Sequence, residues 1–221
     1  MRINKFIASN SSLSRRRADE AIISGRVEIN GLLARPGDII IDTDTVTLDS
    51  HVITPSVKTL MLILNKPVGY VVSRDGQGSQ TVYDLLPSKF HNLNPVGRLD
   101  KDSSGLLLLT NDGNLANRLT HPSFTKTKIY QIELDRPLAS KDITKINNPG
   151  VDIGDKRLSK FIVTTNSRHS PNYQVVLTEG RNRQIRRTFE ALGYKVIALH
   201  RIEFGPYKLG GLQSGKYQEL K

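Results

Sequence analysis

The stretch that decides the fold runs from residue 95 to residue 113 and reads Pro-Val-Gly-Arg-Leu-Asp-Lys-Asp-Ser-Ser-Gly-Leu-Leu-Leu-Leu-Thr-Asn-Asp-Gly. Residues 105–110 form an apolar run that ends in an Asn-Asp-Gly turn, which predicts a buried strand. The loop before this strand starts at Gly97 and contains Asp100 and Asp102. An acid beside a rigid apolar strand is well placed for catalysis because packing fixes its position, although most such acids are structural.

A second segment, residues 179–193, predicts an amphipathic helix rich in arginine. Its apolar side chains share one helical face: Ile185, Phe189 and Leu192. Gly193 is expected to end the helix. With about 100° of rotation per residue, Arg183 and Arg187 point away from this face towards RNA or solvent, whereas Arg186 lies on its flank and can reach a cleft beside the core.

The charge of the chain favours a polyanionic partner. Its 221 residues carry a formal net charge of +11, with a sequence pI of about 9.9. Because the arginines are clustered, nucleic acid is the favoured partner, through phosphate contacts and counterion release. The alternative is a basic protein whose charges are simply solvated. The absence of cysteine excludes disulfides, thiolate metal sites and cysteine nucleophiles.

Residues 1–50 predict a compact helix-helix-strand module. Residues 3–8 have helical apolar spacing, and a second helix is expected to start at the N-cap Ser14 and end at Gly25. A strand at 27–29 enters a tight turn at Asn30-Gly31, and a further strand lies near residues 44–48. The basic residues expected to contact RNA from this module are Arg15, Arg16, Arg17 and Arg26.

The rest of the chain predicts a second, larger domain. Residues 51–59 read as a linker, and residues 60–221 contain apolar runs at 60–64, 105–110 and 173–177 that predict strands with helices between them. The expected fold class is α+β: a small α/β head and a larger domain with a mixed, mainly antiparallel sheet and flanking helices. No apolar run approaches the length of a membrane span, and the opening residues lack the core of a signal peptide, so a cytoplasmic location is expected.

The head, with Leu-Ser-Arg-Arg-Arg-Ala-Asp-Glu-Ala at 13–21 and Gly-Arg-Val-Glu-Ile-Asn-Gly at 25–31, resembles the small RNA-binding fold first seen in ribosomal protein S-four. The Gly-Arg-Leu-Asp loop and the Arg-Gln-Ile-Arg-Arg helix resemble the pseudouridine synthases of the RsuA/RluB type, which act on ribosomal RNA. The resemblance extends through Asn-Lys-Pro-Val-Gly-Tyr at 65–70 to Gly-Lys-Tyr-Gln-Glu-Leu at 215–220. Gly97, where the related RluA-type enzymes usually have histidine, favours the RsuA-like branch.

This resemblance assigns roles to individual residues. It implies that Asp100 is the catalytic aspartate, that Tyr130 stacks on the target base, that Arg186 pairs with the aspartate, and that Leu199 lines the pocket. Arg98, in the same loop as Asp100, is expected to bind substrate. Asp102 receives no catalytic role. The arginines of the larger domain that are expected to bind RNA are Arg181, Arg183 and Arg187.

The implied reaction breaks the N1–C1′ bond of uridine, rotates the uracil and joins C5 to C1′, on a nucleotide flipped out of its stack. An ionised Asp100 could attack the sugar or remove a sugar proton; the residues leave both routes open. Since no electron or group is transferred, neither a cofactor nor a metal is expected. The predicted partner is ribosomal RNA or a pre-ribosomal particle, with large-subunit RNA slightly favoured, and nothing in the sequence requires more than a monomer.

Other functions fit the sequence less well. The five histidines are far apart and show no metal-ligand spacing, and no Gly-rich nucleotide fingerprint is present. Zinc-dependent deaminase chemistry lacks its cysteines. An RNA methyltransferase lacks a recognisable cofactor loop. The strongest alternative is a non-catalytic RNA-binding factor for ribosome assembly, against which the presence of Asp100 argues.

Overall fold

The computed structural model describes residues 1–11, 13–54, 59–121, 126–165 and 170–220. The chain forms two compact units: Met1–Thr59 with Asn111–Gly113, and Leu60–Thr110 with Asn114–Lys221. No helix in the described ranges is long and apolar enough to cross a membrane.

The small unit pairs two helices with a short four-stranded sheet of order β2-β1-β3-β4. Its elements are α1 (Ile3–Asn10), α2 (Arg15–Ile23), β1 (Val27–Ile29), β2 (Leu32–Leu33), β3 (Val46–Leu48) and β4 (His51–Val52). The Ser14 side chain accepts a hydrogen bond from the backbone N–H of Arg17, which confirms the predicted cap. Asn30 and Gly31 have φ values of 52° and 81°, as the predicted tight turn requires.

The predicted linker begins too early. His51 and Val52 pair antiparallel with β3, so this strand belongs to the small unit. Both side chains are exposed, and two exposed residues have no apolar alternation from which a strand could be predicted. Residues 55–58 of the predicted linker lie outside the described residues.

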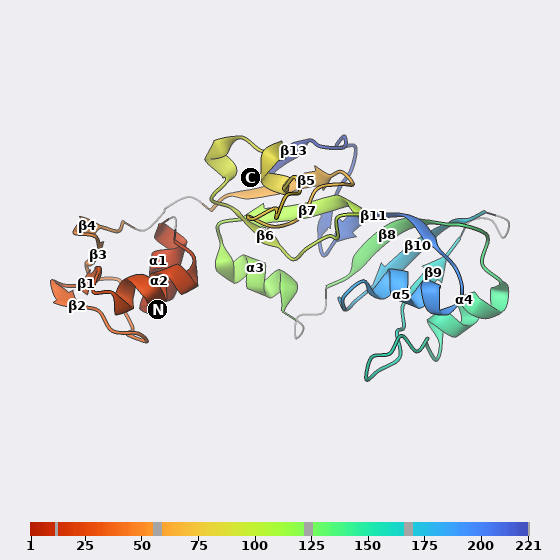
Figure 1. The fold of residues 1–221 in the computed structure, drawn as a ribbon, viewed down its shortest axis with the longest axis horizontal. Helices are drawn as coiled ribbons and strands as arrows, with labels where there is room; N and C mark the ends of the chain where they lie inside the picture. The colour runs from red at the N-terminus through yellow and green to blue at the C-terminus, as the bar shows by residue number, and fades with distance from the viewer. Residues whose placement is uncertain (12, 55–58, 122–125, 166–169, 221) are drawn as a thin grey trace. The chain divides into compact units, whose positions relative to one another are not determined.

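The large unit is built on a nine-stranded sheet with the main order β13-β5-β7-β11-β8-β10-β9, in which β6 pairs with β7 and β12 with β11 (Figure 1). The strands are β5 (Met61–Lys66), β6 (Asn94–Val96), β7 (Ser104–Thr110), β8 (Lys128–Leu134), β9 (Ile162–Thr164), β10 (Asn172–Leu177), β11 (Val196–Phe204), β12 (Tyr207–Lys208) and β13 (Tyr217–Leu220). All described pairings in this sheet are antiparallel except β7 with β11. The predicted mainly antiparallel sheet is confirmed.

The helices of the large unit explain why some strands are apolar on both faces and others on one face only. They are η1 (Val82–Leu85), η2 (Ser88–Phe90), α3 (Gly113–Thr120), α4 (Ser140–Asn147) and α5 (Gln184–Ala191). Leu107 and Leu109 of β7 belong to the cluster that contains η1 and η2, whereas Leu106 and Leu108 pack in the cluster that includes α3 residues. Apolar side chains therefore cover both faces of β7, which accounts for its unbroken leucine run.

The strands β8 and β10 alternate instead, since only one face is covered. Ile132 and Val175 are buried, whereas Gln131 and Gln174 are exposed. The helices α4 and α5 lie along the covered face (Figure 1), where Ile185 and Phe189 of α5 join the core as predicted. A cleft forms on this covered face, next to the central strands β7 and β11.

The parallel pairing of β7 with β11 requires glycine at position 105. Gly105 has a φ of 103°, and a Cβ added there would lie 2.2 Å from the carbonyl oxygen of Arg201. We predict that Gly105→Ala lowers the free energy of unfolding of the large unit by about 3 kcal/mol or more, because it combines backbone strain with overpacking. Denaturant unfolding measures this loss.

Gly211→Ala, also in the large unit, is the matched control, since a Cβ at Gly211 meets nothing within 4 Å and its φ is not positive. Equal, small losses in the two variants would show that the β7–β11 pairing tolerates a side chain.

Candidate active site

The loop that carries Asp100 joins two paired strands. Val96 of β6 is the register partner of Leu108 of β7, so the loop between them connects two neighbouring strands of the sheet. Leu99 is buried in the core, while the side chain of Asp100 is 37% exposed. The backbone N–H of Ser103 donates to the carbonyl oxygen of Asp100 at 3.1 Å and closes the turn. The core therefore anchors the loop and leaves the acid accessible.

A buried lysine ties this loop to β5. The ammonium of Lys66, whose side chain is fully buried, donates to the carbonyl oxygens of Ser103 at 2.6 Å and Pro67 at 2.9 Å. Gly69 N–H donates to the carbonyl oxygen of Lys101 at 2.8 Å, so the two loops run together. Burial lowers the pKa of Lys66 from 10.5 to about 8, although the charges of Asp102 and Asp100 act in the opposite direction.

Asp100 faces a cleft of about 570 Å³ in the large unit. Six residues predicted to act in catalysis or binding line it: Arg98, Asp100, Tyr130, Arg181, Arg183 and Leu199. Tyr130 and Leu199 are largely buried and supply an aromatic and an apolar wall, while Arg98 is exposed at the rim. Arg186 and Arg187 are not among the lining residues. Tyr130 projects from the same strand face as Lys128, which also lines the cleft, as the two-residue period of a strand requires.

The arginine beside Asp100 is Arg183, and the predicted pairing of Arg186 with this aspartate is wrong. Arg183 lies 3.5 Å from the carboxylate of Asp100. Arg186 instead donates to the backbone oxygens of Val196 and Asp102, and its Nε lies 3.2 Å from the Asp102 carboxylate. Burial lowers the pKa of Arg186, partly offset by Asp102. Arg186 therefore holds the loop through Asp102 and does not bind the acid itself.

The backbone conformation of Arg183 explains why this arginine, and not Arg186, lies beside Asp100. Its φ of 45° and ψ of 34° place it in the left-handed region, one residue before α5. The 100° helical rotation does not apply to such a residue, so its side chain turns towards Asp102 and Asp100 rather than to solvent. Both terminal nitrogens of Arg183 donate to the Asp102 carboxylate at 3.0 Å.

Asp102 consequently has a structural role that the sequence did not indicate. Burial works against its charge, but the hydrogen bonds from Arg183 and the charges of Arg186 and Arg183 keep its pKa below the usual value. Removing this charge would free Arg183 and weaken the hold on the loop. Asp102 is therefore unsuitable as an inert neighbour against which to compare Asp100.

Arg181 and Arg187, both predicted to bind RNA, are engaged inside the protein. Each forms an ion pair with Asp155, at 3.1 Å and 2.8 Å respectively. Arg181 also donates to the carbonyl oxygens of Arg157 and Leu158 and to Glu179. The hydrogen bond from Arg187 is the first cause of the lowered pKa of Asp155. These two arginines fix the loop around Asp155 as one wall of the cleft.

The basic residues of the small unit differ from each other. Arg15, Arg16 and Arg17 are exposed at the start of α2. Arg26, although also exposed, forms a two-point hydrogen bond with the carboxylate of Asp49. The charge of Arg26 is thus already matched, whereas the run 15–17 presents its charge to solvent.

The sequence did not indicate several residues in and behind the cleft. Lys66, which supports the Asp100 loop from behind, stands in the quoted Asn-Lys-Pro motif, but only the fold shows that it is buried. Lys128, Arg157 and Arg201 line the cleft, and no role was predicted for them. In the described part of the chain, no group of three or more histidine or acidic residues is placed to hold a metal.

An accessible acid on a fixed loop, an aromatic wall and several arginines in one cleft are chemically suited to a flat, anionic ligand such as a nucleotide. The comparisons with known proteins specify the class. A profile described as RNA pseudouridylate synthase matches residues 60–191. A solved structure titled "Crystal structure of pseudouridylate synthase" superposes with a TM-score of 0.72 at 32% identity, covering 100% of this chain and 96% of the other.

Curated relatives agree with this assignment. Ribosomal large subunit pseudouridine synthase B of Bacillus subtilis is 33% identical, over 99% of this chain and 91% of its own length. Dual-specificity RNA pseudouridine synthase RluF of Escherichia coli K12 is 36% identical, over 100% of this chain and 75% of its own length. The chain belongs to the RNA pseudouridylate synthase family, and it is an isomerase.

The buried ammonium of Lys66 generates a prediction about pH. Because the folded pKa of about 8 lies below the ordinary 10.5, the folded state disfavours the charged form. The resulting penalty is complete below pH 8 and disappears as the pH rises to 10.5, so stability from this group increases across that window. We predict that the free energy of unfolding of the wild type, minus that of Lys66→Met, increases with pH over this range in urea titrations.

Lys101→Met, at an exposed lysine of the Asp100 loop, is the control for removing a lysine that is not buried. A difference that is flat or falls with pH for Lys66→Met would contradict the buried, charged lysine.

Proposed function

We propose that this pseudouridine synthase isomerises a uridine of ribosomal RNA, with large-subunit RNA slightly favoured, and that Asp100 is its catalytic residue. The observation that carries the proposal is the state of the acids in the cleft. Two acids are among its described lining residues, Asp100 and Glu179. Glu179 accepts hydrogen bonds from Arg181 and Gln184. Asp100 has only the longer ion pair with Arg183 among the described contacts of its carboxylate, so it is the acid available for chemistry.

The remaining residues fit a flipped nucleotide. Tyr130 offers a ring face for stacking, and Leu199 an apolar wall against which a detached uracil can turn. Asp100 acts on the sugar, either by attack on C1′ or by removing a sugar proton, and the rearrangement conserves every atom of the nucleotide. Arg183 stabilises the carboxylate of Asp100.

The substrate assignment has a separate basis. The relative in Bacillus subtilis is named for the ribosomal large subunit. The net charge of +11 suits a large polyanion such as ribosomal RNA or a pre-ribosomal particle, and a cytoplasmic location follows from that substrate. We further infer that the small unit is an RNA-binding domain of the ribosomal protein S-four type, with Arg15, Arg16 and Arg17 as its main phosphate contacts.

The catalytic assignment is tested by Asp100→Asn, which keeps the shape of the side chain and removes its ability to act as a nucleophile or base. We expect loss of pseudouridine formation on ribosomal RNA, by at least about 10³-fold, with near-normal RNA binding and thermal unfolding. The matched control is Asp152→Asn: Asp152 is exposed, and its oxygen accepts from the Gly154 N–H as an asparagine oxygen also can. Near-normal turnover by Asp100→Asn would refute the assignment of Asp100 as the catalytic residue.

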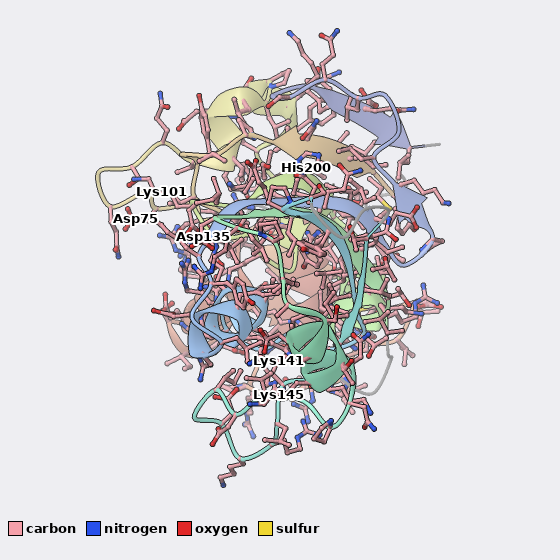
Figure 2. All side chains as sticks on the ribbon, turned by 90° about the vertical axis from the view of Figure 1, so that its right-hand side faces the viewer. Asp75, Lys101, Asp135, Lys141, Lys145 and His200 are labelled. Atoms are coloured by element: carbon pink, nitrogen blue, oxygen red, sulfur yellow. The ribbon has the colours of Figure 1, made fainter. Side chains whose placement is uncertain are left out.

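The RNA-binding role of the small unit is tested by salt dependence. Replacing Arg15, Arg16 and Arg17 with glutamine should weaken RNA binding and flatten the plot of log K against log salt by about 0.7–0.9 for each phosphate that is no longer neutralised. The control replaces three exposed lysines of the large unit with glutamine: Lys141, Lys145 and Lys156, the first two one turn apart on α4 (Figure 2). An unchanged slope in the arginine variant, or an equal change in the control, would give the small unit another role.

A further inference from the structure

Arg201 is a buried cation with an unused donor. It lies in β11, is 2% exposed, and its Nε donates to the carbonyl oxygen of Leu106 at 2.8 Å. One of its terminal nitrogens is buried and has no hydrogen-bond partner among the described residues. A buried, unpaired donor on a charged group is costly, so its retention points to a partner that arrives with a ligand.

This donor belongs to the catalytic cleft. Arg201 and Leu199 both line the cleft, whereas His200 between them lies on the other face of the sheet, away from α4 and α5 (Figure 2). The register partner of Arg201 across the sheet is Tyr130, the proposed stacking residue. The unused donor therefore belongs to the strand position next to the proposed site of the target base.

A second cation stands beside Arg201. The ammonium of Lys128 and the guanidinium of Arg201 lie 5.5 Å and 5.0 Å from the centre of the Phe204 ring. Lys128 donates to the carbonyl oxygen of Glu179 at 3.0 Å. Its pKa is lowered, first by burial and then by the charge of Arg201, with Glu179 acting in the opposite direction. Two partly desolvated cations thus face the same end of the cleft, with no carboxylate hydrogen-bonded to either among the described contacts.

A nucleotide could bind Arg201 and Lys128 through its uracil or through a phosphodiester, and the positive charges of the two side chains favour the phosphodiester. A uracil carbonyl could accept from one donor but would leave both positive charges uncompensated. A phosphodiester brings a negative charge and two non-bridging oxygens, which match a guanidinium and a neighbouring ammonium. Since a flipped nucleotide carries its own flanking phosphates into the cleft, a phosphate is available there.

We propose that Arg201 and Lys128 form a phosphate subsite that holds a phosphodiester flanking the target uridine. This inference rests on the proposed function, because it takes the nucleotide bound on Tyr130 as its starting point. Binding there is ionic and does not depend on base identity, so the subsite positions the nucleotide while Tyr130 and Leu199 contact the uracil.

The test uses three small probes: uridine, uridine 3′-monophosphate and uridine 5′-monophosphate, each as a competitor of RNA binding. For the wild type we expect at least one monophosphate to bind about ten-fold tighter than uridine, as a charge-assisted contact implies. In Arg201→Met this ratio should fall close to one while uridine itself binds as before. Lys128→Met should lower the ratio as well, and it leaves the Leu106 hydrogen bond intact if Arg201→Met fails to fold.

Three results would overturn the subsite: equal binding of uridine and both monophosphates by the wild type, an unchanged ratio in Lys128→Met, or equal weakening of all three probes in Arg201→Met. The last would indicate a contact with uracil. Asp100→Asn separates this proposal from the function, since it should abolish turnover and keep the wild-type ratio. An active Asp100→Asn enzyme with the ratio intact would refute the catalytic assignment alone.

Discussion

The ammonium of Lys66 is shared by two backbone carbonyls, and the position of the cleft depends on that interaction. Pro67 begins the loop after β5, and Ser103 ends the loop before β7. The backbone carbonyls of both residues accept hydrogen bonds from this one buried cation. Water cannot replace the ammonium at a fully buried position, so losing it would leave two acceptors unsatisfied. The turn that carries Asp100 is thereby fixed to the buried strands β5 and β7, although a charge must be buried to do so.

The charges around that turn divide into those that hold the loop and the carboxylate of Asp100, which faces the cleft. Arg186 and Asp102 hold the loop, where they bind each other and the backbone of the turn. Arg183 connects the two because it bonds Asp102 and lies near Asp100. Arg181 and Arg187 both form ion pairs with Asp155. Several arginines that look like RNA contacts in the sequence therefore shape the cleft, and the acid that they surround is left accessible.

The sequence predicts the features that arise from neighbouring residues, and it does not predict those that depend on residues distant in the chain. The strand β7 and the helix α5 follow from runs of apolar spacing, and the N-cap at Ser14 from local hydrogen bonding. The turn of Arg183 into the left-handed region is not local, since it is compensated by Asp102, 81 residues earlier in the chain. The ion pairs of Asp155 and the cross-strand pairing of Arg201 with Tyr130 are likewise created by the tertiary fold. Resemblance to a family pointed to Asp100, Tyr130 and Leu199, which all line the cleft, whereas the arginine beside Asp100 is Arg183 and not the expected Arg186.

The central claim is that this cleft converts a uridine of ribosomal RNA, and the most direct measurement is made on that RNA. Pseudouridine should be mapped at single-nucleotide resolution across the ribosomal RNAs of cells with and without this protein, and again after the gene is restored. We expect that one or a few positions, most readily in the large-subunit RNA, lose pseudouridine when the protein is absent and regain it on restoration. Identical maps in all three cases would contradict this claim.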